Sequence, residues 1–460
     1  MRYSVTFFER DFNALSQHLA ATPGLEQAAY LVCRAAITSS EARLIVRDVL
    51  PVDGTDILAN SSHHMKIASR SFIRAMKKAD RQKSCFLFVH SHPDGYPDHS
   101  AQDDVEEREL FSTAYNRIRT AGVHASLVFM NGAPSSGRVW LEDGSHVSLE
   151  RIRIIGNRFR FIFLRQQQVY IPEFFDRQVR AFGPDVQRLL QELRVGIVGV
   201  GGTGSCVAEQ LVRLGVGSVL IADGENFEAT NVNRVYGSRV VDADLPKVKL
   251  AERMGADIGL GTKIDVIPKP ITFESVLSEF RTCDVIFGCT DDEFGRSLLT
   301  RFAVYYGIPV FDMGVKIHSE SQTVRSIQGR VTTLMPGTAC LNCRGRLLSE
   351  RINAEARRAV NPEAAAELEE EGYIPELEDP APAVVPFTTA VAASAVGEFL
   401  HRLTGFLGDD RRSSEVLHLI DHTRIRTNHV FPRDGCFCGD ATFWGRADVK
   451  PFLDTTWRPE

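Results

Sequence analysis

The sequence predicts an α/β protein with two domains, a smaller N-terminal α+β domain and a larger doubly wound domain built on a mostly parallel sheet. The chain has 460 residues, enough for two or three separately buried cores. Residues 1–150 alternate short β-rich runs, such as 85–89 and 125–130, with helical stretches. From residue 171 onward, apolar runs typical of buried parallel strands alternate with helical segments.

Changes in composition along the chain indicate the boundaries. We expect the first domain at residues 1–150, a basic, aromatic and β-branched connector at 151–175, and the second domain at 176–460. Residues 344–382 are rich in Ala, Arg and Glu and end in the acidic run 367–379, so they form an expected helical excursion from the sheet. The expected elements of the second domain are strands at 195–200, 218–222, 285–289, 309–313 and 416–420 and helices ending at 214 and spanning 388–403.

Composition also excludes some classes of function. Hydrophobic residues make up 43% of the chain and charged residues 24%, as in ordinary globular proteins. The net charge of -6 gives no reason to expect a nucleic-acid partner. We find neither a signal peptide nor an apolar run that could span a bilayer, so we expect a cytoplasmic protein without a membrane partner.

Two histidines directly follow the expected strand at residues 85–89. Because His90 and His92 are two residues apart, their side chains point to the same side of an extended chain and can share a metal ion. Asp103, a short loop later, supplies a third ligand and leaves a fourth position for water, the arrangement of a catalytic zinc. The sequence therefore predicts a zinc site on these three side chains.

The full pattern, His-x-His-Pro-x6-Ser-x2-Asp, resembles the JAMM metalloproteases, which remove ubiquitin-like proteins or trim their C-termini. The resemblance implies a cytidine-deaminase-like α+β fold, with Glu26 as general base and Ser100 as hydrogen-bond donor to the tetrahedral oxyanion. Zinc would lower the pKa of its bound water toward about 7. His99 and Asp104 fall outside the pattern, and we expect them to be solvated loop residues.

A glycine-rich turn lies between an expected strand and an expected helix in the second domain. Glycines at such a turn let the backbone approach phosphate groups, which the free N–H groups of the helix then bind. An acid such as Asp223, at the end of the next strand, can bind ribose hydroxyls. Alone, this pattern fits a dinucleotide-binding dehydrogenase equally well. The glycines of the turn are Gly199, Gly201, Gly202 and Gly204.

Residues beyond the turn narrow the choice. Asn231, Arg234 and Lys247 follow the turn in order, and Asp291 ends a further strand, with Arg296 shortly after it. From about residue 171 to 439, this series resembles the adenylation domain of the ubiquitin-activating superfamily, which includes the molybdopterin-synthase and thiamine-pathway adenylyltransferases. The implied substrates are ATP and the C-terminal glycine of a β-grasp, ubiquitin-like protein.

The resemblance also implies a role for each residue. Asp223 would hold the ribose, Asn231, Arg234 and Lys247 would lie at the phosphates, and Asp291 would hold Mg²⁺. In this family an arginine like Arg177 reaches into the neighbouring subunit's site, which implies a homodimer. One departure is Val235, where the family often has Gln.

Four of the nine cysteines come in two close pairs. Four thiolates can close a tetrahedral structural zinc site, and the family has paired cysteines here, although its second pair usually has two intervening residues. Relatives often carry an acceptor cysteine after the first pair, but residues 344–435 contain none. We therefore expect the adenylate to pass to a separate thiol, on a conjugating enzyme or a sulfur donor. The paired cysteines are Cys340, Cys343, Cys436 and Cys438.

The leading interpretation joins both halves in processing of one ubiquitin-like protein, which the first domain exposes or deconjugates and the second adenylates. A first alternative is activation of a sulfur carrier for thiocarboxylate formation, with the metal domain trimming the carrier. A second is a non-enzymatic dimeric scaffold, against which Arg234, Lys247 and Asp291 speak because a scaffold needs no phosphate-binding charges. A dehydrogenase is less favoured, because it has no use for Lys247 or Arg177.

Overall fold

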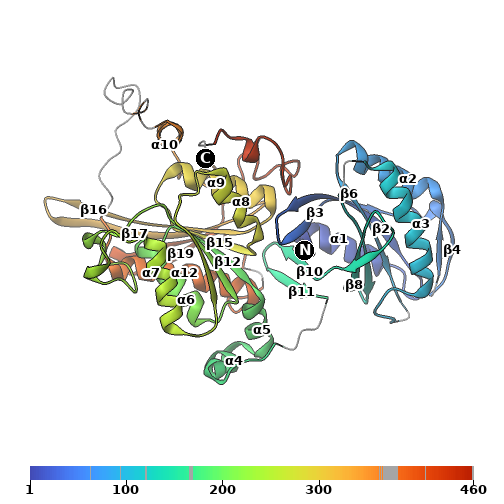
Figure 1. Cartoon of the computed structure of the whole chain (residues 1–460), viewed down its shortest axis with the longest axis horizontal. Helices are drawn as coiled ribbons and strands as arrows, with labels where there is room; N and C mark the ends of the chain where they lie inside the picture. Colours follow the sequence, from blue (N-terminus) through green and yellow to red (C-terminus); the bar gives the residue numbers. More distant parts are fainter. Residues whose placement is uncertain are drawn as a thin grey trace. The chain divides into compact units, whose positions relative to one another are not determined.

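The structure is a computed structural model that describes residues 1–62, 64–93, 95–119, 122–164, 169–361, 363, 365, 382–409 and 411–457. The chain divides into two compact units, and Figure 1 labels many of their elements. The first unit comprises Met1–Gln167 together with Gly445–Asp448, and the second comprises Gln168–Trp444 together with Val449–Glu460.

A nine-stranded mixed sheet forms the centre of the first unit, in the order β11-β10-β1-β3-β2-β6-β7-β8-β9. A separate hairpin consists of β4 (Ile57–Asn60) and β5 (Met65–Ile67). The strands of the sheet are β1 (Arg2–Phe8), β2 (Ala28–Ile37), β3 (Glu41–Pro51), β6 (Cys85–Ser91), β7 (His124–Met130), β8 (Ala133–Trp140), β9 (His146–Ser148), β10 (Arg151–Ile155) and β11 (Arg160–Phe163).

Helices cover both faces of this sheet. Successive residues of β2 join different cores, because side chains alternate between the two faces of a strand. Phe12, from α1 (Glu9–Leu19), packs into the core on one face. Met76, from α2 (Ser69–Arg81), and Phe111, from α3 (Ala101–Arg117), pack into the core on the other. The sheet therefore has two buried faces and a helix, α3, that follows the predicted metal-binding loop.

Residues 151–175, the expected connector, are not all connecting chain. β10 pairs in parallel with β1, and β11 pairs with β10, so residues 151–163 extend the first sheet. Ile152 and Ile154 are fully buried in the core of that unit. The basic residues that suggested a connector include Arg153, which is also buried and forms an ion pair with Glu41.

An eight-stranded sheet forms the second unit, in the order β14-β13-β12-β15-β16-β17-β18-β19. The strands β14, β13, β12, β15 and β16 are parallel to one another. The pairs β16–β17, β17–β18 and β18–β19 are antiparallel. The predicted doubly wound class is confirmed, because the chain starts at the central β12, winds out to β14 and returns to β15. The strands are β12 (Arg194–Val198), β13 (Ser218–Ala222), β14 (Lys263–Ile267), β15 (Val285–Gly288), β16 (Val310–Glu320), β17 (Thr323–Leu334), β18 (Glu415–Leu419) and β19 (Arg424–Asn428).

Helices and short 3₁₀ turns connect these strands. Among the described residues, no helix combines the length and the apolar character that a bilayer crossing requires. Of the expected excursion, residues 349–360 are helical, whereas the acidic run 367–379 lies outside the described residues. The helices are α4 (Asp176–Phe182), α5 (Pro184–Glu192), α6 (Gly202–Arg213), α7 (Lys247–Ile258), α8 (Glu274–Glu279), α9 (Glu293–Tyr306), α10 (Ser349–Val360) and α12 (Val385–Thr404).

The strands and helices predicted for the second unit are confirmed to within a few residues, except that the strand expected at 309–313 extends to Glu320 as β16. The apolar runs that predicted them are buried on both sides. Val195, Ile197, Val219 and Ile221, for example, have no exposed surface. Such runs are the sequence signature of a parallel sheet covered on both faces.

Candidate active sites

The first candidate site is at the end of β6. His90 lies in β6, His92 directly follows it, and Asp103 lies in the first turn of α3. His90 Nε2 lies 3.0 Å from His92 Nε2 and 3.3 Å from Asp103 Oδ1, and His92 Nε2 lies 3.5 Å from Asp103 Oδ2. The structure therefore brings the three predicted ligands together, with all ligand atoms within 4.8 Å of one another.

Hydrogen bonding prepares these side chains to bind a cation. His92 Nδ1 lies 3.0 Å from the carbonyl oxygen of Tyr96, to which it can donate, so that its Nε2 keeps a lone pair for a metal. Burial raises the pKa of Asp103, but the hydrogen bonds from His90 and His92 outweigh it and hold that pKa well below its usual range. A carboxylate and two imidazole nitrogens suit Zn²⁺, so the residues fit the predicted ion.

Glu26 and Ser100 flank this cluster. Glu26 is only 6% exposed, and burial raises its pKa, while the nearby His90 and His92 lower it. Burial has the larger effect, so the pKa of Glu26 is raised, as suits a general base. Its loop is held by the β4–β5 hairpin: its N–H donates to Ser61 O, and Asn60 Nδ2 donates to its carbonyl oxygen.

Ser100 has a structural role that the sequence reasoning missed. It is the N-cap of α3, where its Oγ accepts from the Asp103 N–H and donates to Asp103 Oδ2 at 2.7 Å. The Ser100 N–H also donates to Asp103 Oδ2, which completes a capping box. The spacing Ser-x-x-Asp before a helix was the signal that could have shown this. The helix cap thus aims the third metal ligand.

The expectation that His99 is a solvated loop residue is wrong, because its side chain is only 4% exposed. Its Nε2 lies 3.1 Å from Ser126 Oγ and its Nδ1 lies 3.2 Å from Ser136 Oγ. Burial lowers its pKa to about 4, so the ring is neutral near pH 7. Asp104 is half-exposed but forms an ion pair with the buried Arg138. His99 and Asp104 thus contact residues of β7 and β8. These strands are distant in sequence, so the sequence around His99 and Asp104 does not predict the contacts.

The second candidate site lies where the winding of the second sheet reverses, between β12 and β15. Ligands bind at such a switch point, beyond the carboxyl ends of the strands. Gly199 there has φ +85°, and a Cβ on it would lie 2.9 Å from the carbonyl oxygen of Cys289. A Cβ on Gly204 would lie 1.9 Å from Gly199 O. These two positions therefore require glycine, and α6 begins between them at Gly202.

Asp223 is tied to the glycine turn. Its Oδ2 accepts from the N–H of Val200 at 2.8 Å, and its Oδ1 accepts from the N–H of Glu225 at 2.8 Å. Burial raises the pKa of this carboxyl group. Lys247 begins α7 and forms an ion pair with Glu225. The predicted ribose-binding acid and one predicted phosphate-binding cation thus lie next to each other.

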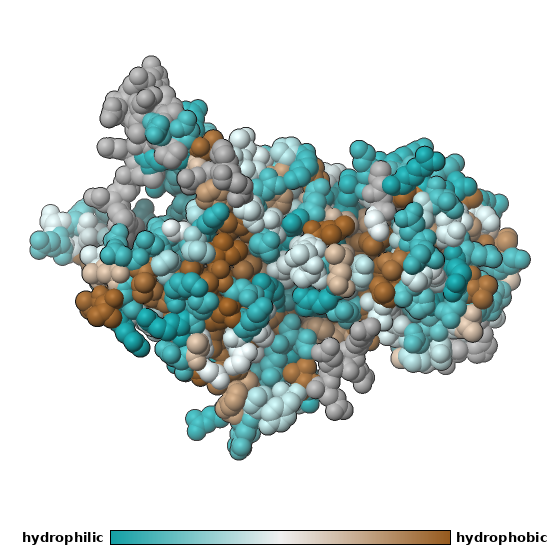
Figure 2. Space-filling model, in the orientation of Figure 1, coloured by the Kyte–Doolittle hydropathy of each residue, from teal (hydrophilic) through white to brown (hydrophobic). Residues whose placement is uncertain are grey.

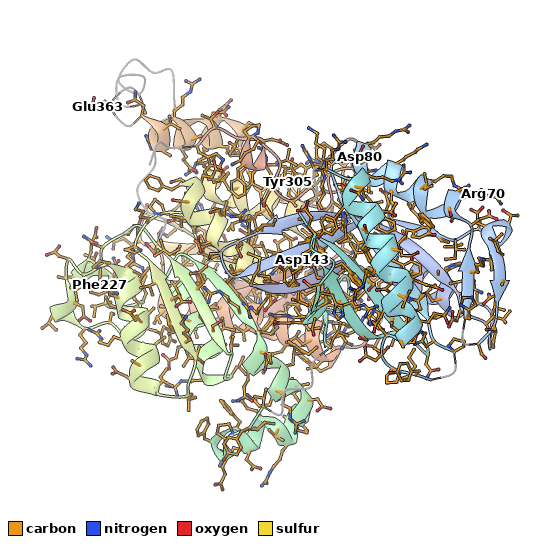
Figure 3. The ribbon with its side chains drawn as sticks, turned by 45° about the vertical axis from the view of Figure 1, so that its right-hand side comes forward. Arg70, Asp80, Asp143, Phe227, Tyr305 and Glu363 are labelled. Carbon is orange, nitrogen blue, oxygen red and sulfur yellow. The ribbon has the colours of Figure 1, made fainter. Side chains whose placement is uncertain are left out.

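The other phosphate-site residues follow Asp223. Arg234 Cδ lies 3.5 Å from the position of a Cβ on Gly202, so this arginine lies against the start of α6. Asn231 is buried, with 5% exposure, in the preceding 3₁₀ turn. Val235 forms a small core with Phe227 (labelled in Figure 3) and Leu250. Val235, which stands where the family often has Gln, is therefore a core residue in this chain.

Asp291 and Asp292 lie in the loop between β15 and α9 and have different surroundings. Asp292 is the N-cap of α9, with Oδ1 accepting from the Gly295 N–H. Asp291 is exposed, and its carboxylate is the one of the two that is not engaged in capping that helix. Arg296 forms a two-bond ion pair with the buried Asp312, at 2.9 and 3.0 Å. Arg177 is exposed on α4.

The four paired cysteines meet in one cluster. The Sγ–Sγ distances are 3.7 Å for Cys340–Cys343 and for Cys340–Cys436, 3.6 Å for Cys343–Cys438 and 3.5 Å for Cys436–Cys438. Four thiolates at about 2.3 Å from a tetrahedral zinc are separated by about 3.8 Å. A disulfide would need about 2.05 Å. The sulfurs therefore fit a structural zinc ion, although the second pair has one intervening residue.

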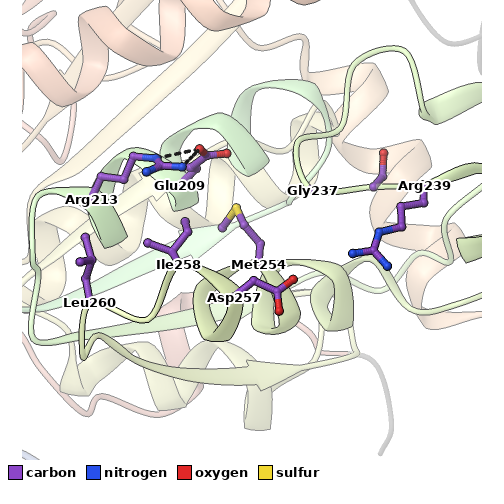
Figure 4. A pocket seen from close by; sticks show the side chains of 9 residues that line it. Glu209, Arg213, Gly237, Arg239, Met254, Asp257, Ile258 and Leu260 are labelled. Carbon is purple, nitrogen blue, oxygen red and sulfur yellow. Dashed lines mark hydrogen bonds and ion pairs between the residues drawn. The ribbon is translucent and has the colours of Figure 1, made fainter.

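A groove of about 580 Å³ lies elsewhere on the second unit, between the C-terminal parts of α6 and α7 (Figure 4). An ion pair of Arg213 with Glu209 lines one side. Figure 2 shows apolar side chains among hydrophilic ones on the visible face of the second unit. Val240 and Val241, which directly follow the lining residue Arg239, are 67% and 84% exposed. None of the residues predicted for either site lines this groove.

Comparison with known proteins concerns both units of the chain. The fold and the two clusters define a chain with a JAB/MPN-like domain followed by a nucleotide-binding domain of the ubiquitin-activating type. The chain belongs to the ThiF family, whose model matches residues 175–435. A model of prokaryotic homologues of the JAB domain matches residues 8–141. The predicted resemblance to both families is thereby confirmed.

Two relatives with assigned functions each match about a third of the chain. A sulfur carrier protein ThiS adenylyltransferase of Bacillus subtilis is 34% identical over 164 residues, 35% of this chain and 46% of the relative. A ubiquitin-like modifier-activating enzyme 5 of Drosophila willistoni is 30% identical over 172 residues, 35% of this chain and 40% of the relative. The chain therefore spans less than half the length of these relatives.

Among solved structures, MccB of E. coli with MccA-N7isoASN has a TM-score of 0.47 and 16% identity. The match covers 59% of this chain and 76% of MccB.

Proposed function

We propose that the second unit uses ATP and Mg²⁺ to adenylate the C-terminal carboxylate of a ubiquitin-like or sulfur-carrier protein, and that the first unit is a zinc-dependent peptidase for the same protein. The observation that carries the adenylation proposal is the grouping of Asp223, Arg234 and Lys247 around a glycine turn in a ThiF-family domain. Family membership makes a dehydrogenase the weaker interpretation.

The residues of the second unit suit attack of a carboxylate on the α-phosphate of ATP, with pyrophosphate leaving. Such a step depends on positioning and on neutralising phosphate charge. The free N–H groups at the start of α6 and the side chains of Arg234 and Lys247 would bind phosphate oxygens. Asp223 would hold the ribose, and the exposed Asp291 would bind Mg²⁺. Lys247 would leave Glu225 for the nucleotide, since phosphate carries more negative charge.

ATP–pyrophosphate exchange tests this proposal. With small β-grasp proteins ending in glycine, we expect exchange that depends on the partner and falls at least about 100-fold in Asp291→Ala, because the charge on the pyrophosphate is no longer neutralised. Asp257→Ala is a matched control, since Asp257 is an exposed acid that lines the groove instead. Exchange by Asp291→Ala at the wild-type rate would refute the assigned role. No exchange with any candidate protein would favour the scaffold.

In the first unit, His90, His92 and Asp103 would hold Zn²⁺, which supplies an activated water and a Lewis acid when bound. Glu26 would take a proton from the attacking water and return it to the leaving amine. Ser100 would donate a hydrogen bond to the developing oxyanion, which requires its hydroxyl to leave Asp103 Oδ2.

Zinc content and peptide cleavage test the metal centre separately. We expect the wild-type chain to hold two zinc ions, one per cluster, and His90→Ala to hold one. Cleavage of a β-grasp protein carrying a C-terminal extension should be lost in His90→Ala and in Glu26→Gln, the latter with zinc retained. Equal zinc content in wild type and His90→Ala would remove the metal centre from the proposal.

The second candidate product is a thiocarboxylate on a sulfur carrier. It is favoured by the lack of cysteine in residues 344–435, which leaves this segment without a thioester acceptor. The mass of the partner after reaction decides: lysine-linked adducts indicate conjugation, whereas replacement of one oxygen by sulfur indicates carriage. Four further points belong to the proposal. They are the homodimer, the action of Arg177 in the partner subunit, the cytoplasmic location and a domain boundary near residue 167.

A further inference from the structure

The antiparallel end of the second sheet has one face that points away from α12. On the other face, a Cβ on Gly329 in β17 would lie 2.3 Å from Val391 of α12, so the helix covers the side to which Gly329 points. His418 in β18 pairs with Gly329 and shares that side. Because successive side chains of a strand alternate between faces, Leu417 and Leu419 in β18 lie on the side away from α12.

The register of the strands arranges this second face in two rows, since directly paired residues share one face of a sheet. Each row crosses β16, β17, β18 and β19 and has a leucine at its centre, and we call the two rows together the β16–β19 face. The members are Gly314, Arg330, Leu417 and Arg426 in one row, and Lys316, Gln328, Leu419 and Arg424 in the next. The leucines are partly buried, whereas the cations Lys316, Arg424 and Arg426 are exposed around them.

These three cations have no partner in the described part of the chain. Lys316, Arg424 and Arg426 form neither an ion pair nor a side-chain hydrogen bond there, whereas Arg330 pairs with the buried Asp312. The whole chain has a net charge of -6, so its composition does not account for this local positive charge. Charges that protect a sheet edge from pairing account for cations on the edge strand β19, but not for Lys316, which lies three strands inward.

The β16–β19 face lies within reach of the glycine turn. Val198, the last residue of β12, pairs with Gly288, and Gly288 pairs with Asp312 in the parallel strand β16. Lys316 therefore lies four residues, about 13 Å, beyond the level at which the glycine turn begins. With four strand spacings of about 4.8 Å between β12 and β18, the leucines are about 20–25 Å from that turn. An extended C-terminal tail of roughly seven residues would span this distance.

We propose that the β16–β19 face docks the protein substrate of the second unit and selects an acidic partner, one with an apolar surface surrounded by carboxylates. Protein interfaces combine an apolar centre with a polar rim, and complementary charges determine which partner associates and how fast. Arg424 and Arg426 would pair with carboxylates on one side of the leucines and Lys316 on the other. This inference rests on the proposed adenylation, to which it adds the chemistry of the partner's docking surface.

ATP–pyrophosphate exchange with β-grasp proteins that end in glycine and range from acidic to basic tests the inference. We expect acidic members to be accepted. Arg424→Glu/Arg426→Glu should raise the KM for the accepted protein at least about 10-fold at low salt, because two attractive contacts become repulsive. The value of kcat should change by less than about 2-fold, since neither arginine belongs to the nucleotide site.

The matched control is Arg213→Glu/Lys263→Glu, which changes the net charge equally. These side chains are 59% and 73% exposed, at the end of α6 and on β14, the opposite edge of the sheet. We expect the control to leave KM within about 2-fold of the wild-type value. Should Arg424→Glu/Arg426→Glu not fold, Lys316→Glu tests the other side of the leucines and should also raise KM.

The outcomes separate this inference from the proposed function. A wild-type KM in Arg424→Glu/Arg426→Glu, or a preference for basic β-grasp proteins, would overturn the inference and leave adenylation standing. Exchange with no candidate would refute the proposed function. Calorimetric titration of the acidic proteins would then decide, and absence of binding to wild type would overturn the inference as well. A dimer that dissociates in Arg424→Glu/Arg426→Glu but not in the control would show that the face joins two copies instead.

Discussion

At the scale of single residues, burial determines which polar side chains of this chain can carry charge. His99 and His124 are both buried in the first unit, and burial lowers the pKa of each to about 4. Glu41 shows the opposite case: burial raises its pKa, but Arg153 and Arg43 outweigh burial and hold that pKa far below its usual range. A buried acid stays ionised here because arginines are beside it, whereas the buried histidines stay neutral.

His124 makes the first unit sensitive to acid. Its Nδ1 accepts from the Phe86 N–H at 3.1 Å, and its side chain is fully buried. The folded pKa of about 4 is below the unfolded value of about 6.5, so this contribution to stability is complete above pH 6.5. It decreases as the pH falls toward 4, by about 3 kcal/mol in all, because the unfolded chain binds the proton first.

Hydrogen exchange in β6 and β7 measures this effect. The free energy of local opening should fall between pH 7 and pH 5 in the wild type, and fall less in His124→Gln. His146→Gln is the control, since His146 is exposed in β9 of the same sheet. Parallel pH dependences for His124→Gln and wild type would contradict the assignment.

At the scale of elements, each site is located where a strand ends and a helix begins. β6 leads through a loop into α3, whose capping box aims Asp103 at His90 and His92. β12 leads through the glycine turn into α6, whose first N–H groups have no partner within the helix. In both units the end of the strand fixes the position of the loop, and the first turn of the helix orients the groups of the site. A short strand–loop–helix segment therefore determines most of the geometry of each site.

The β12–α6 turn should tolerate one added methyl group and reject another. In Gly204→Ala the new Cβ would lie 1.9 Å from Gly199 O, a backbone atom that cannot move aside cheaply. We expect a loss of roughly 2–4 kcal/mol of unfolding free energy. In Gly201→Ala nothing lies within 4 Å of the new Cβ, and the change should stay within about 0.5 kcal/mol. Urea unfolding of both variants checks this, and equal stabilities would contradict it.

At the scale of the whole molecule, contacts between residues far apart in sequence hold each unit together. The cysteine cluster joins Cys340 and Cys343 to Cys436 and Cys438, across the segment that contains α10 and α12. Arg344, next to the cluster, donates to Ala339 O and forms an ion pair with Glu415 in β18. A metal at this point would therefore fasten the end of the chain to the antiparallel edge of the second sheet.

Loss of this metal should affect the second unit selectively. In Cys340→Ser we expect the thermal transition of the second unit to fall by several degrees, because metal binding contributes directly to folding. The two cores of the first unit contain none of these cysteines and should keep their transition. Differential scanning calorimetry with and without a chelator checks the prediction. A chelator that lowers the second transition of Cys340→Ser as much as that of wild type would contradict it.

The sequence by itself determined the parts whose signal is local. Continuous apolar runs predicted β12, β13 and β15, and the spacing of His90, His92 and Asp103 predicted three side chains that the structure brings together. These predictions hold because they depend on local geometry. A strand places residues two apart on the same side, and few residues other than glycine can adopt the backbone conformation of such a turn. Resemblance to known families added roles for residues that spacing alone could not assign.

Tertiary structure decided what depends on contacts between distant residues. It placed β10 and β11 in the first sheet. It made Asp292, rather than Asp291, the N-cap of α9 and buried Val235 in a small hydrophobic core. It also buried His99 against β7 and β8, where Glu107 and Arg138 meet. The physical reason is the same in each case: whether a polar side chain is solvated depends on which strands and helices pack over it, and local periodicity carries no record of that packing.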